Sequence, residues 1–209
     1  MNVVLFGASG MIGSRILKEL IARGHKVTVV ARDPAKVPNS ANVKVVRGDA
    51  LNAESVASAA KGADAVISAY GPGTGAPQLM EDSARALIAG LRKAGVKRVL
   101  MVGGAGSLLV APGVDLIDSG HLPEQWRGIA VAHRDALKIL RESDLDWTSL
   151  SPAGFIQPGE RTGKFRLGGD WLMKDEKGNS NISAEDYAVA LVDELVKPQH
   201  IRQRFTLAY

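Results

Sequence analysis

Three glycines, Gly7, Gly10 and Gly13, lie three residues apart in LFGASGMIGSRILKEL (5–20), between an apolar run and an amphipathic one. In a phosphate-binding turn the first glycine allows a sharp bend and the second lets a phosphate approach the backbone, while the third lets the helix pack closely on the sheet. The N–H groups at the helix start then face the phosphates. The pattern predicts nucleotide binding, and the alternative is an ordinary glycine turn. The residues expected at the phosphates are Gly7, Ser9, Gly10, Met11, Ile12 and Gly13.

A second group of polar residues follows the next apolar run, in VVARDPAK (29–36). In dinucleotide-binding domains an acidic residue at this place holds the ribose 2′-hydroxyl, whereas an arginine suits a 2′-phosphate. Arg32 comes first and Lys36 follows one helical turn later, and Arg32 can hold a phosphate with two parallel hydrogen bonds. We therefore predict NADP(H) as the cofactor, with NAD(H) as the alternative. Asp33 favours NAD(H) unless it caps the next turn instead.

Apolar runs alternate with amphipathic stretches along the whole chain, which indicates a parallel sheet covered by helices on both faces. We predict one α/β domain over residues 1–209, a Rossmann fold with a doubly wound sheet. Two stretches rich in Gly and Pro, 104–126 and 153–182, break this rhythm after strands, so we expect them over the carboxyl edge, where ligands bind. The expected strands are 2–7, 25–32, 42–49, 63–70, 97–104, 145–152 and 204–209, and the expected helices are 11–24, 53–61, 77–94, 127–143 and 183–196.

Composition excludes several classes of protein. The 209 residues contain no cysteine, which removes disulfides, thiolate nucleophiles and cysteine-ligated metals, and we predict no metal site. The N-terminal sequence lacks the pattern of a signal peptide, and no apolar run is long enough to span a membrane, so we expect a cytoplasmic protein. The net charge of +4 comes from scattered basic residues, and we expect no nucleic-acid partner. We expect a monomer or a homodimer.

Four segments carry a resemblance to a known superfamily: GASGMIGSRIL (7–17), ARDPAK (31–36), VVRGDALNAESV (45–56) and DAVISAYGP (64–72). They resemble the extended or atypical short-chain dehydrogenases/reductases, and more narrowly the NmrA-like NAD(P)H-binding branch that includes the biliverdin-IXβ/flavin reductases. The resemblance implies a Rossmann fold and further contacts to the cofactor. It places Asp49 and Ala50 at the adenine, Ala69, Tyr70 and Gly71 on the adenosine ribose side, and Pro152, Ala153 and Phe155 over the nicotinamide. The alternatives are that Asp49 is a helix N-cap and that Phe155 belongs to the core.

The resemblance also suggests catalytic residues. Short-chain dehydrogenases use a Ser after the fifth strand and a Tyr-x-x-x-Lys motif on the following helix. This chain has Ser107 and Lys138, but Arg134 stands where the tyrosine would be. His133 stands where the resembled flavin and biliverdin reductases also carry His, and its alternative is a surface histidine. The catalytic candidates are therefore Ser107, His133 and Lys138.

The missing tyrosine narrows the range of acceptors that the protein could reduce. Reduction of an unactivated ketone needs a proton donor for the developing alkoxide. An electron-poor flavin or quinone needs less, because a solvent proton can follow the hydride. We therefore predict hydride transfer from NADPH to a flavin, quinone or similar planar acceptor. The alternatives are a non-catalytic, NADP-binding redox-sensing regulator and an NAD(P)-dependent epimerase or isomerase, in which Tyr70 or His133 would supply acid and base.

The walls of an acceptor site are predicted in the two irregular stretches. The segment 106–126 contains isolated apolar residues that could wall such a site or form a dimer contact. We expect the opposite wall in LGGDWLM (167–173). The apolar residues concerned are Leu108, Leu109, Leu116, Ile117, Leu122 and Trp126 on one side and Trp171 and Leu172 on the other.

Overall fold

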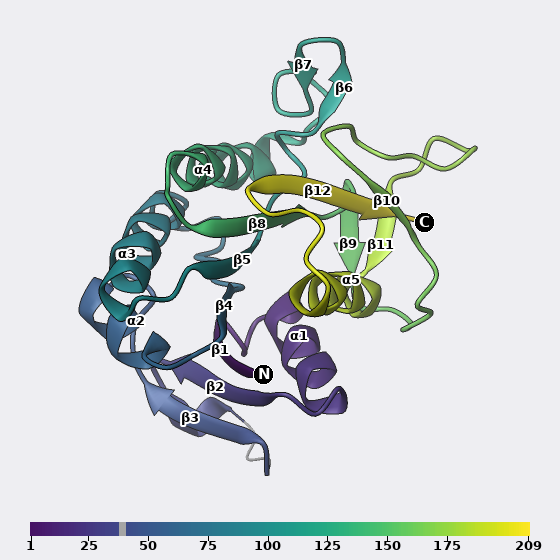
Figure 1. The fold of residues 1–209 in the computed structure, drawn as a ribbon. Coiled ribbons are helices and arrows are strands. Elements are labelled where there is room, and N and C mark those ends of the chain that lie inside the picture. The colour runs from purple at the N-terminus through teal and green to yellow at the C-terminus, as the bar shows by residue number, and fades with distance from the viewer. Residues whose placement is uncertain (38–40) are drawn as a thin grey trace.

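In the computed structural model, which describes residues 1–37 and 41–209, eight strands form one central sheet and five helices cover its two faces (Figure 1). The sheet strands are β1 (Asn2–Phe6), β2 (Lys26–Ala31), β3 (Val43–Arg47), β4 (Ala65–Ser68), β5 (Arg98–Val102), β8 (Asp146–Ser151), β10 (Arg166–Gly168) and β12 (Gln203–Ala208). The helices are α1 (Met11–Ala22), α2 (Ala53–Ala60), α3 (Leu79–Ala94), α4 (Glu124–Arg141) and α5 (Ala184–Val196).

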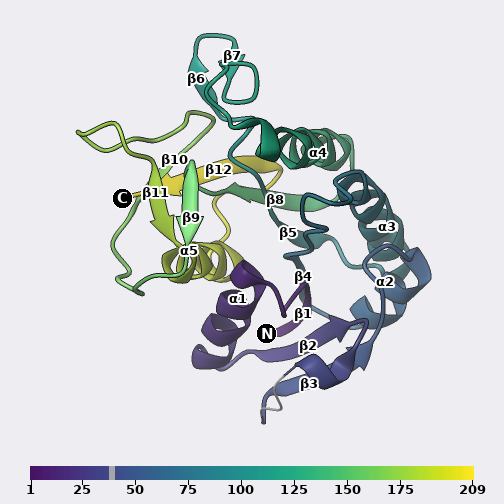
Figure 2. The same ribbon diagram turned by 180° about the vertical axis from the view of Figure 1, so that it is seen from behind.

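The strand order is β10-β12-β8-β5-β4-β1-β2-β3. The chain builds one half of the sheet from β1 outward through β2 to β3, then returns to add β4 on the other side of β1. Figures 1 and 2 show α1 and α5 on one face and α2, α3 and α4 on the other. The prediction of a doubly wound Rossmann domain is therefore confirmed. The reversal of strand order beside β1 is the place where such sheets bind ligands.

Alternating residues of the inner strands feed two separate hydrophobic clusters. Val3 and Leu5 of β1 pack on the side of α1 and α5, whereas Val4 and Phe6 pack on the side of α2 and α3. Successive strand residues point to opposite faces, so a strand covered by helices on both sides reads as a continuous apolar run. This explains why β1 was recognisable from the sequence. The rigid centre holds the carboxyl ends of β1 and its neighbours in place.

The two irregular stretches contain short elements that the sequence did not predict. β6 (Leu109–Ala111) and β7 (Val114–Asp115) form a hairpin, and β9 (Phe155–Gln157) pairs in parallel with β11 (Asn181–Ser183). β10 joins the edge of the main sheet antiparallel to β12, which corrects the expectation of a wholly parallel sheet. Strands of two or three residues are too short to show a hydrophobic period.

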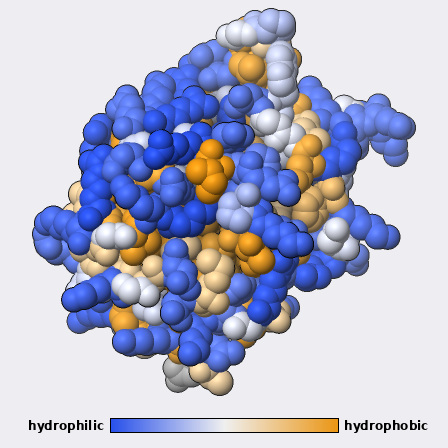
Figure 3. Space-filling view, viewed as in Figure 1, coloured by the Kyte–Doolittle hydropathy of each residue, from blue (hydrophilic) through white to orange (hydrophobic). Residues whose placement is uncertain are grey.

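α4 begins at Glu124, three residues before the predicted start at 127. Trp126, expected in the preceding loop, therefore lies on the first turn of this helix, half exposed. Among the described residues, no helix has both the length and the apolar character that a membrane crossing requires. The face drawn in Figure 3 is mostly hydrophilic, with apolar residues in small separate patches.

Candidate functional site

The turn between β1 and α1 has a shape that requires glycine at two of its three positions. Gly7 has a φ of +80°, and a Cβ on it would lie 2.3 Å from the carbonyl oxygen of Ala69. A Cβ on Gly13 would lie 2.0 Å from the carbonyl oxygen of Gly7, so the helix packs directly on the turn. A Cβ on Gly10 would meet nothing nearer than 3.4 Å. The protein's own packing therefore does not require glycine at Gly10, which fits a position kept bare for a ligand.

The N-terminus of α1 has the features of an anion-binding helix start. Gly10 is the N-cap and supplies no side-chain hydrogen bond to the helix, and no acidic residue lies in the first turn. The first N–H groups of a helix have no intrahelical acceptor, and the helix dipole adds partial positive charge there. Met11, Ile12 and Gly13 form this first turn and contribute through their backbone N–H groups. The side chain of Met11 is exposed, whereas that of Ile12 packs against the core.

A cleft of about 520 Å³ opens at the carboxyl ends of the inner strands. It brings together nine of the predicted cofactor residues, from four separate parts of the chain. Sequence reasoning missed other lining residues, among them Val29 and Val37, because their apolar character marks them only as core. The nine are Gly7, Ser9, Gly10, Arg32, Asp49, Ala50, Ala69, Tyr70 and Gly71.

Asp49 and Tyr70 both line this cleft, and the charge of Asp49 acts on the Tyr70 hydroxyl. The Asp49 carboxylate accepts a hydrogen bond from the Leu51 N–H at 3.0 Å. Asn52, not Asp49, is the N-cap of α2, so the alternative role considered for Asp49 is wrong. Burial raises the pKa of Tyr70, with the charge of Arg32 acting against the shift and that of Asp49 adding to it. The Tyr70 hydroxyl is therefore protonated at neutral pH.

The end of β2 resolves the role of Asp33. Its side chain caps the short 3₁₀ turn η1 (Pro34–Lys36), accepting the N–H of Ala35 at 3.3 Å. The predicted capping role is confirmed. Arg32 is exposed at the rim of the cleft. The side chain of Lys36 lies outside the described part of the chain, and its predicted contact stays a prediction.

His133 is on α4 and packs against Gly104, in the segment that follows the carboxyl end of β5. A Cβ on Gly104 would lie 2.8 Å from the Cβ of His133 and 3.1 Å from its Cγ, so the imidazole packs directly on this backbone. Its Nδ1 is buried and has no hydrogen-bond partner among the described residues. Burial lowers the pKa of His133 to about 4. The imidazole is neutral at pH 7, and the residue is partly buried on α4 instead of fully exposed at the surface.

Ser107 and Lys138 are brought together outside the cofactor cleft. They line a separate pocket of about 230 Å³, together with Arg134 and Arg204. The Ser107 hydroxyl accepts a hydrogen bond from Arg204 at 3.3 Å, and Lys138 forms an ion pair with Asp135 at 2.7 Å. No residue lining this pocket also lines the cleft. Their catalytic roles stay predictions that the geometry does not favour.

The two irregular stretches meet over one end of the sheet. The Leu109 N–H donates to the Asp170 carbonyl at 2.8 Å, and the Leu172 N–H donates to the Leu109 carbonyl at 2.9 Å. Trp171, between these two contacts, is 50% exposed, and Phe155 is 57% exposed, so the core alternative for Phe155 is wrong. The other predicted wall and lid residues divide by burial: Leu108, Ile117, Pro152 and Ala153 are buried, and Leu116, Leu122 and Leu172 are partly exposed.

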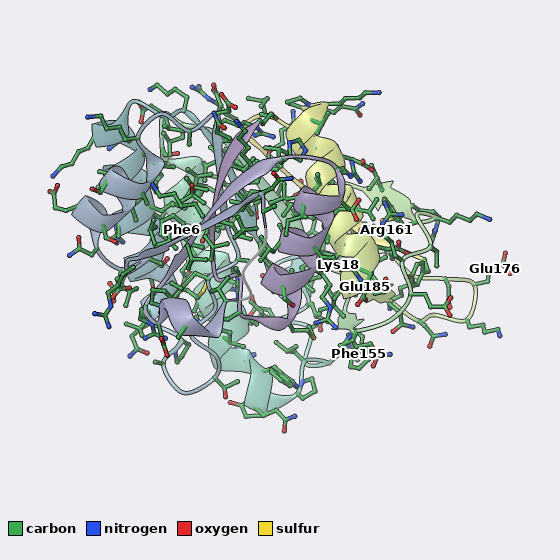
Figure 4. The ribbon with its side chains drawn as sticks, turned by 90° about the horizontal axis from the view of Figure 1, so that it is seen from below. Phe6, Lys18, Phe155, Arg161, Glu176 and Glu185 are labelled. Atoms are coloured by element: carbon green, nitrogen blue, oxygen red, sulfur yellow. The ribbon has the colours of Figure 1, made fainter. Side chains whose placement is uncertain are left out.

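A salt bridge joins α1 to α5, and Glu185 of α5 in turn contacts the second irregular stretch. Arg15 of α1 pairs with Glu185 of α5 at 2.9 Å, and its guanidinium also donates to the Met11 carbonyl. Glu185 accepts the Gly159 N–H at 2.7 Å. A second bridge joins Arg161 to Glu19 at 2.8 Å. Figure 4 shows Arg161 and Glu185 on the same side of the molecule. Partners so far apart in the chain leave no local signal in a sequence.

Comparison with known proteins identifies the family. Residues 7–198 match the family described as NAD(P)H-binding, and this span contains the glycine turn and every cleft residue except Phe6. The chain is a member of the NAD(P)H-binding family. The Rossmann fold and the glycine turn place this NAD(P)H-binding domain among the atypical short-chain dehydrogenases/reductases. The predicted resemblance is thereby confirmed.

Solved structures of similar proteins cover the NAD(P)H-binding domain completely. A proposed exported protein from Burkholderia pseudomallei is 51% identical over 100% of both chains, with a TM-score of 0.92. A proposed epimerase from Bacteroides thetaiotaomicron is 43% identical over 100% of this chain and 96% of its own, with a TM-score of 0.92. A proposed NADH-flavin reductase from Streptococcus pneumoniae is 36% identical over 100% and 99%, with a TM-score of 0.89.

Proposed function

We propose that this NAD(P)H-binding protein is an oxidoreductase that passes hydride from NADPH to a flavin, quinone or similar planar acceptor. One observation carries the proposal. Arg134, which stands at the place of the tyrosine acid, pairs with Asp115 and Asp118, each at 3.3 Å. His133 is neutral at pH 7. Neither side chain is suited to protonate an alkoxide, and a planar, electron-poor acceptor does not require it.

In this proposal the residues of the chain bind NADPH and orient it. The first turn of α1 holds the pyrophosphate with backbone N–H groups, and Arg32 holds the 2′-phosphate at the rim of the cleft. The bound nicotinamide supplies the hydride. Gly104, on whose backbone His133 packs, would let a bound nicotinamide approach the segment after β5. The proton that follows the hydride comes from water, because the site is open.

The acceptor is proposed to lie against the exposed aromatic residues of the irregular stretches. Phe155 and Trp171 each expose half or more of their surface. Such rings stack on planar heteroaromatic molecules. The similar protein from Streptococcus pneumoniae, a proposed NADH-flavin reductase, supports this class of acceptor.

The test is NADPH oxidation over a panel of FMN, riboflavin, small quinones and simple aldehydes, repeated with NADH. We expect turnover with flavins or quinones and none with aldehydes. Turnover of aldehydes alone would overturn the argument from the missing tyrosine. Tight NADPH binding without turnover on any acceptor would favour the redox-sensing regulator.

An epimerase or isomerase is the second candidate, because the similar protein from Bacteroides thetaiotaomicron is a proposed epimerase. This reaction needs an acid/base group near the cofactor, and Tyr70 is a protonated hydroxyl in the cleft. Replacement of Tyr70 by Phe would abolish epimerisation, whereas flavin reduction would survive it.

We further propose that the protein acts in the cytoplasm as a monomer or homodimer, which cell fractionation and sedimentation would test.

A further inference from the structure

Arg47, the last residue of β3, lies beside Arg32 at the end of the neighbouring strand. β2 and β3 run parallel with Ala31 opposite Arg47, so both strands end at the same level of the sheet. The Arg47 Nε donates a hydrogen bond to the Arg32 carbonyl at 3.3 Å. Both arginines are exposed. The sequence placed Arg32 at the cofactor but gave no role to Arg47.

Arg47 is bordered by cleft residues on two sides. Arg32 is its neighbour in space, and Gly48, Asp49 and Ala50, which follow it in the chain, line the cleft. The glycine turn that receives the pyrophosphate lies at the end of β1, two strands away from β3. Arg47 is therefore on the adenosine side of the cleft, next to the place where β2 presents its residue to the ribose 2′ position.

Two arginines, Arg32 and Arg47, lie at this rim of the cleft, whose lining also contains Asp33 and Asp49. Within residues 1–37 and 41–209, no salt bridge joins Arg32 or Arg47 to a carboxylate. The Arg47 Nε lies 3.3 Å from the Arg32 backbone carbonyl, so both cations start from one rim of the cleft and can reach the same anion. A phosphate monoester carries close to two negative charges at neutral pH and offers several acceptor oxygens. The ribose 2′-hydroxyl of NAD(H) carries no negative charge and has only one oxygen.

We propose that Arg47 is a second specificity-determining residue, which forms with Arg32 a two-arginine clamp for the 2′-phosphate of NADP(H). The choice between the two cofactors is then set by two strands, not by the β2 turn alone. This assignment rests on the proposed use of NADPH and extends it to a residue outside the fingerprint.

The test measures binding of NADP⁺ and NAD⁺ to the full chain by calorimetry, with no acceptor present. The two ligands differ only in the 2′-phosphate. For Arg47→Gln we expect NADP⁺ binding to weaken about tenfold, as for the loss of one charge-assisted hydrogen bond, while NAD⁺ binding stays unchanged. Lys44→Gln is the matched control, because Lys44 is an exposed cation on the same strand that does not line the cleft. It should alter neither affinity.

The pH dependence gives a second readout. The 2′-phosphate gains its second charge around pH 6, so the wild-type preference for NADP⁺ should increase from about pH 5.5 to about pH 7.5. The increase should be smaller in Arg47→Gln. Equal weakening of both ligands in this variant would mean that Arg47 only supports the Arg32 backbone, and the proposal would be wrong. Unchanged binding of both ligands would also overturn it.

Failure of the clamp and failure of the reductase function are distinguishable. A wild-type protein that reduces flavins but binds both dinucleotides equally would refute the clamp and leave hydride transfer standing. A protein that loses its NADP⁺ preference in Arg47→Gln but turns over no acceptor would support the clamp and refute the reductase. Arg32→Gln, measured beside them, tests the first arginine alone.

Discussion

At the scale of single residues, substitutions of Gly10 and Gly13 should have different effects: the first on cofactor binding and the second on the stability of the fold. A Cβ on Gly10 would make only ordinary contacts, whereas one on Gly13 would lie 2.0 Å from a backbone oxygen. We expect Gly10→Ala to cost at most about 1 kcal/mol in the free energy of unfolding and to weaken NADPH binding at least tenfold. Gly13→Ala should cost more than about 3 kcal/mol. Urea unfolding without cofactor, followed by NADPH titration, checks both. Normal NADPH affinity in Gly10→Ala would contradict the assignment of the bare position.

His133 gives a prediction about pH. Its pKa of about 4 in the folded protein lies below the value of about 6.5 expected when unfolded. The unfolded chain therefore binds a proton first as the pH falls, so stability is complete above about pH 6.5 and is lost toward pH 4. Between about pH 8 and pH 5 we expect this residue to remove about 2 kcal/mol from the free energy of unfolding. Urea unfolding at both pH values should show a smaller loss in His133→Gln, and exposed His121→Gln serves as the control.

Sequence reasoning at this scale worked where a residue type has a position-specific reason. The glycine turn, the capping role of Asp33 and the position of Arg32 in the cleft lining all follow from short-range chemistry at a strand end. It could not predict the packing of His133 on Gly104, because this contact joins a helix to a distant strand end. Ser107 was placed by resemblance alone, and its hydroxyl contacts Arg204 instead of lying in the cleft.

At the scale of elements, Glu185 of α5 links α1 to the second irregular stretch, because it pairs with Arg15 and accepts the Gly159 N–H. Burial raises the pKa of Glu185, but hydrogen bonds from Arg15 and the Gly159 N–H outweigh this and hold the pKa below its usual value. We expect Glu185→Gln to cost about 1 kcal/mol, since the pair is partly exposed. Hydrogen exchange should accelerate at residues 155–163 and stay unchanged in β1. Glu81→Gln, which removes an exposed pair on α3, is the control. Unchanged exchange at 155–163 would show that this bridge does not hold the stretch.

The elements that the sequence predicted are those long enough to show a period. β1 and β2 are largely apolar runs of five and six residues, which is long enough to indicate a buried strand. α3 and α5 each cover several helical turns, so their apolar residues repeat at the helical spacing. β6, β7, β9 and β11 are too short for either pattern, and their pairing depends on contacts between distant segments. The cofactor half of the site therefore follows from the sequence, and the acceptor half does not.

At the scale of the whole molecule, the two halves of the site differ in how far the protein builds them. The cofactor cleft has a volume of about 520 Å³ and is lined from four parts of the chain. The acceptor side presents Phe155 and Trp171 on an open surface. A planar acceptor stacked only on such rings buries little area, and the nicotinamide of a bound cofactor would complete its site. The proposed reaction is therefore ordered, with NADPH binding first.

Thermal unfolding with single ligands tests this order. A ligand at about 100 times its Kd adds about 2.7 kcal/mol to the free energy of unfolding, which should raise the Tm of a chain of this size by roughly 5–10 °C. We expect NADP⁺ to produce such a shift and FMN alone to produce almost none. FMN added with saturating NADP⁺ should raise the Tm further, and this extra shift should disappear in Phe155→Ala, whereas Trp126→Ala, on the first turn of α4, should retain it. A full shift with FMN alone would mean that the acceptor site exists before the cofactor binds, and the order would be random.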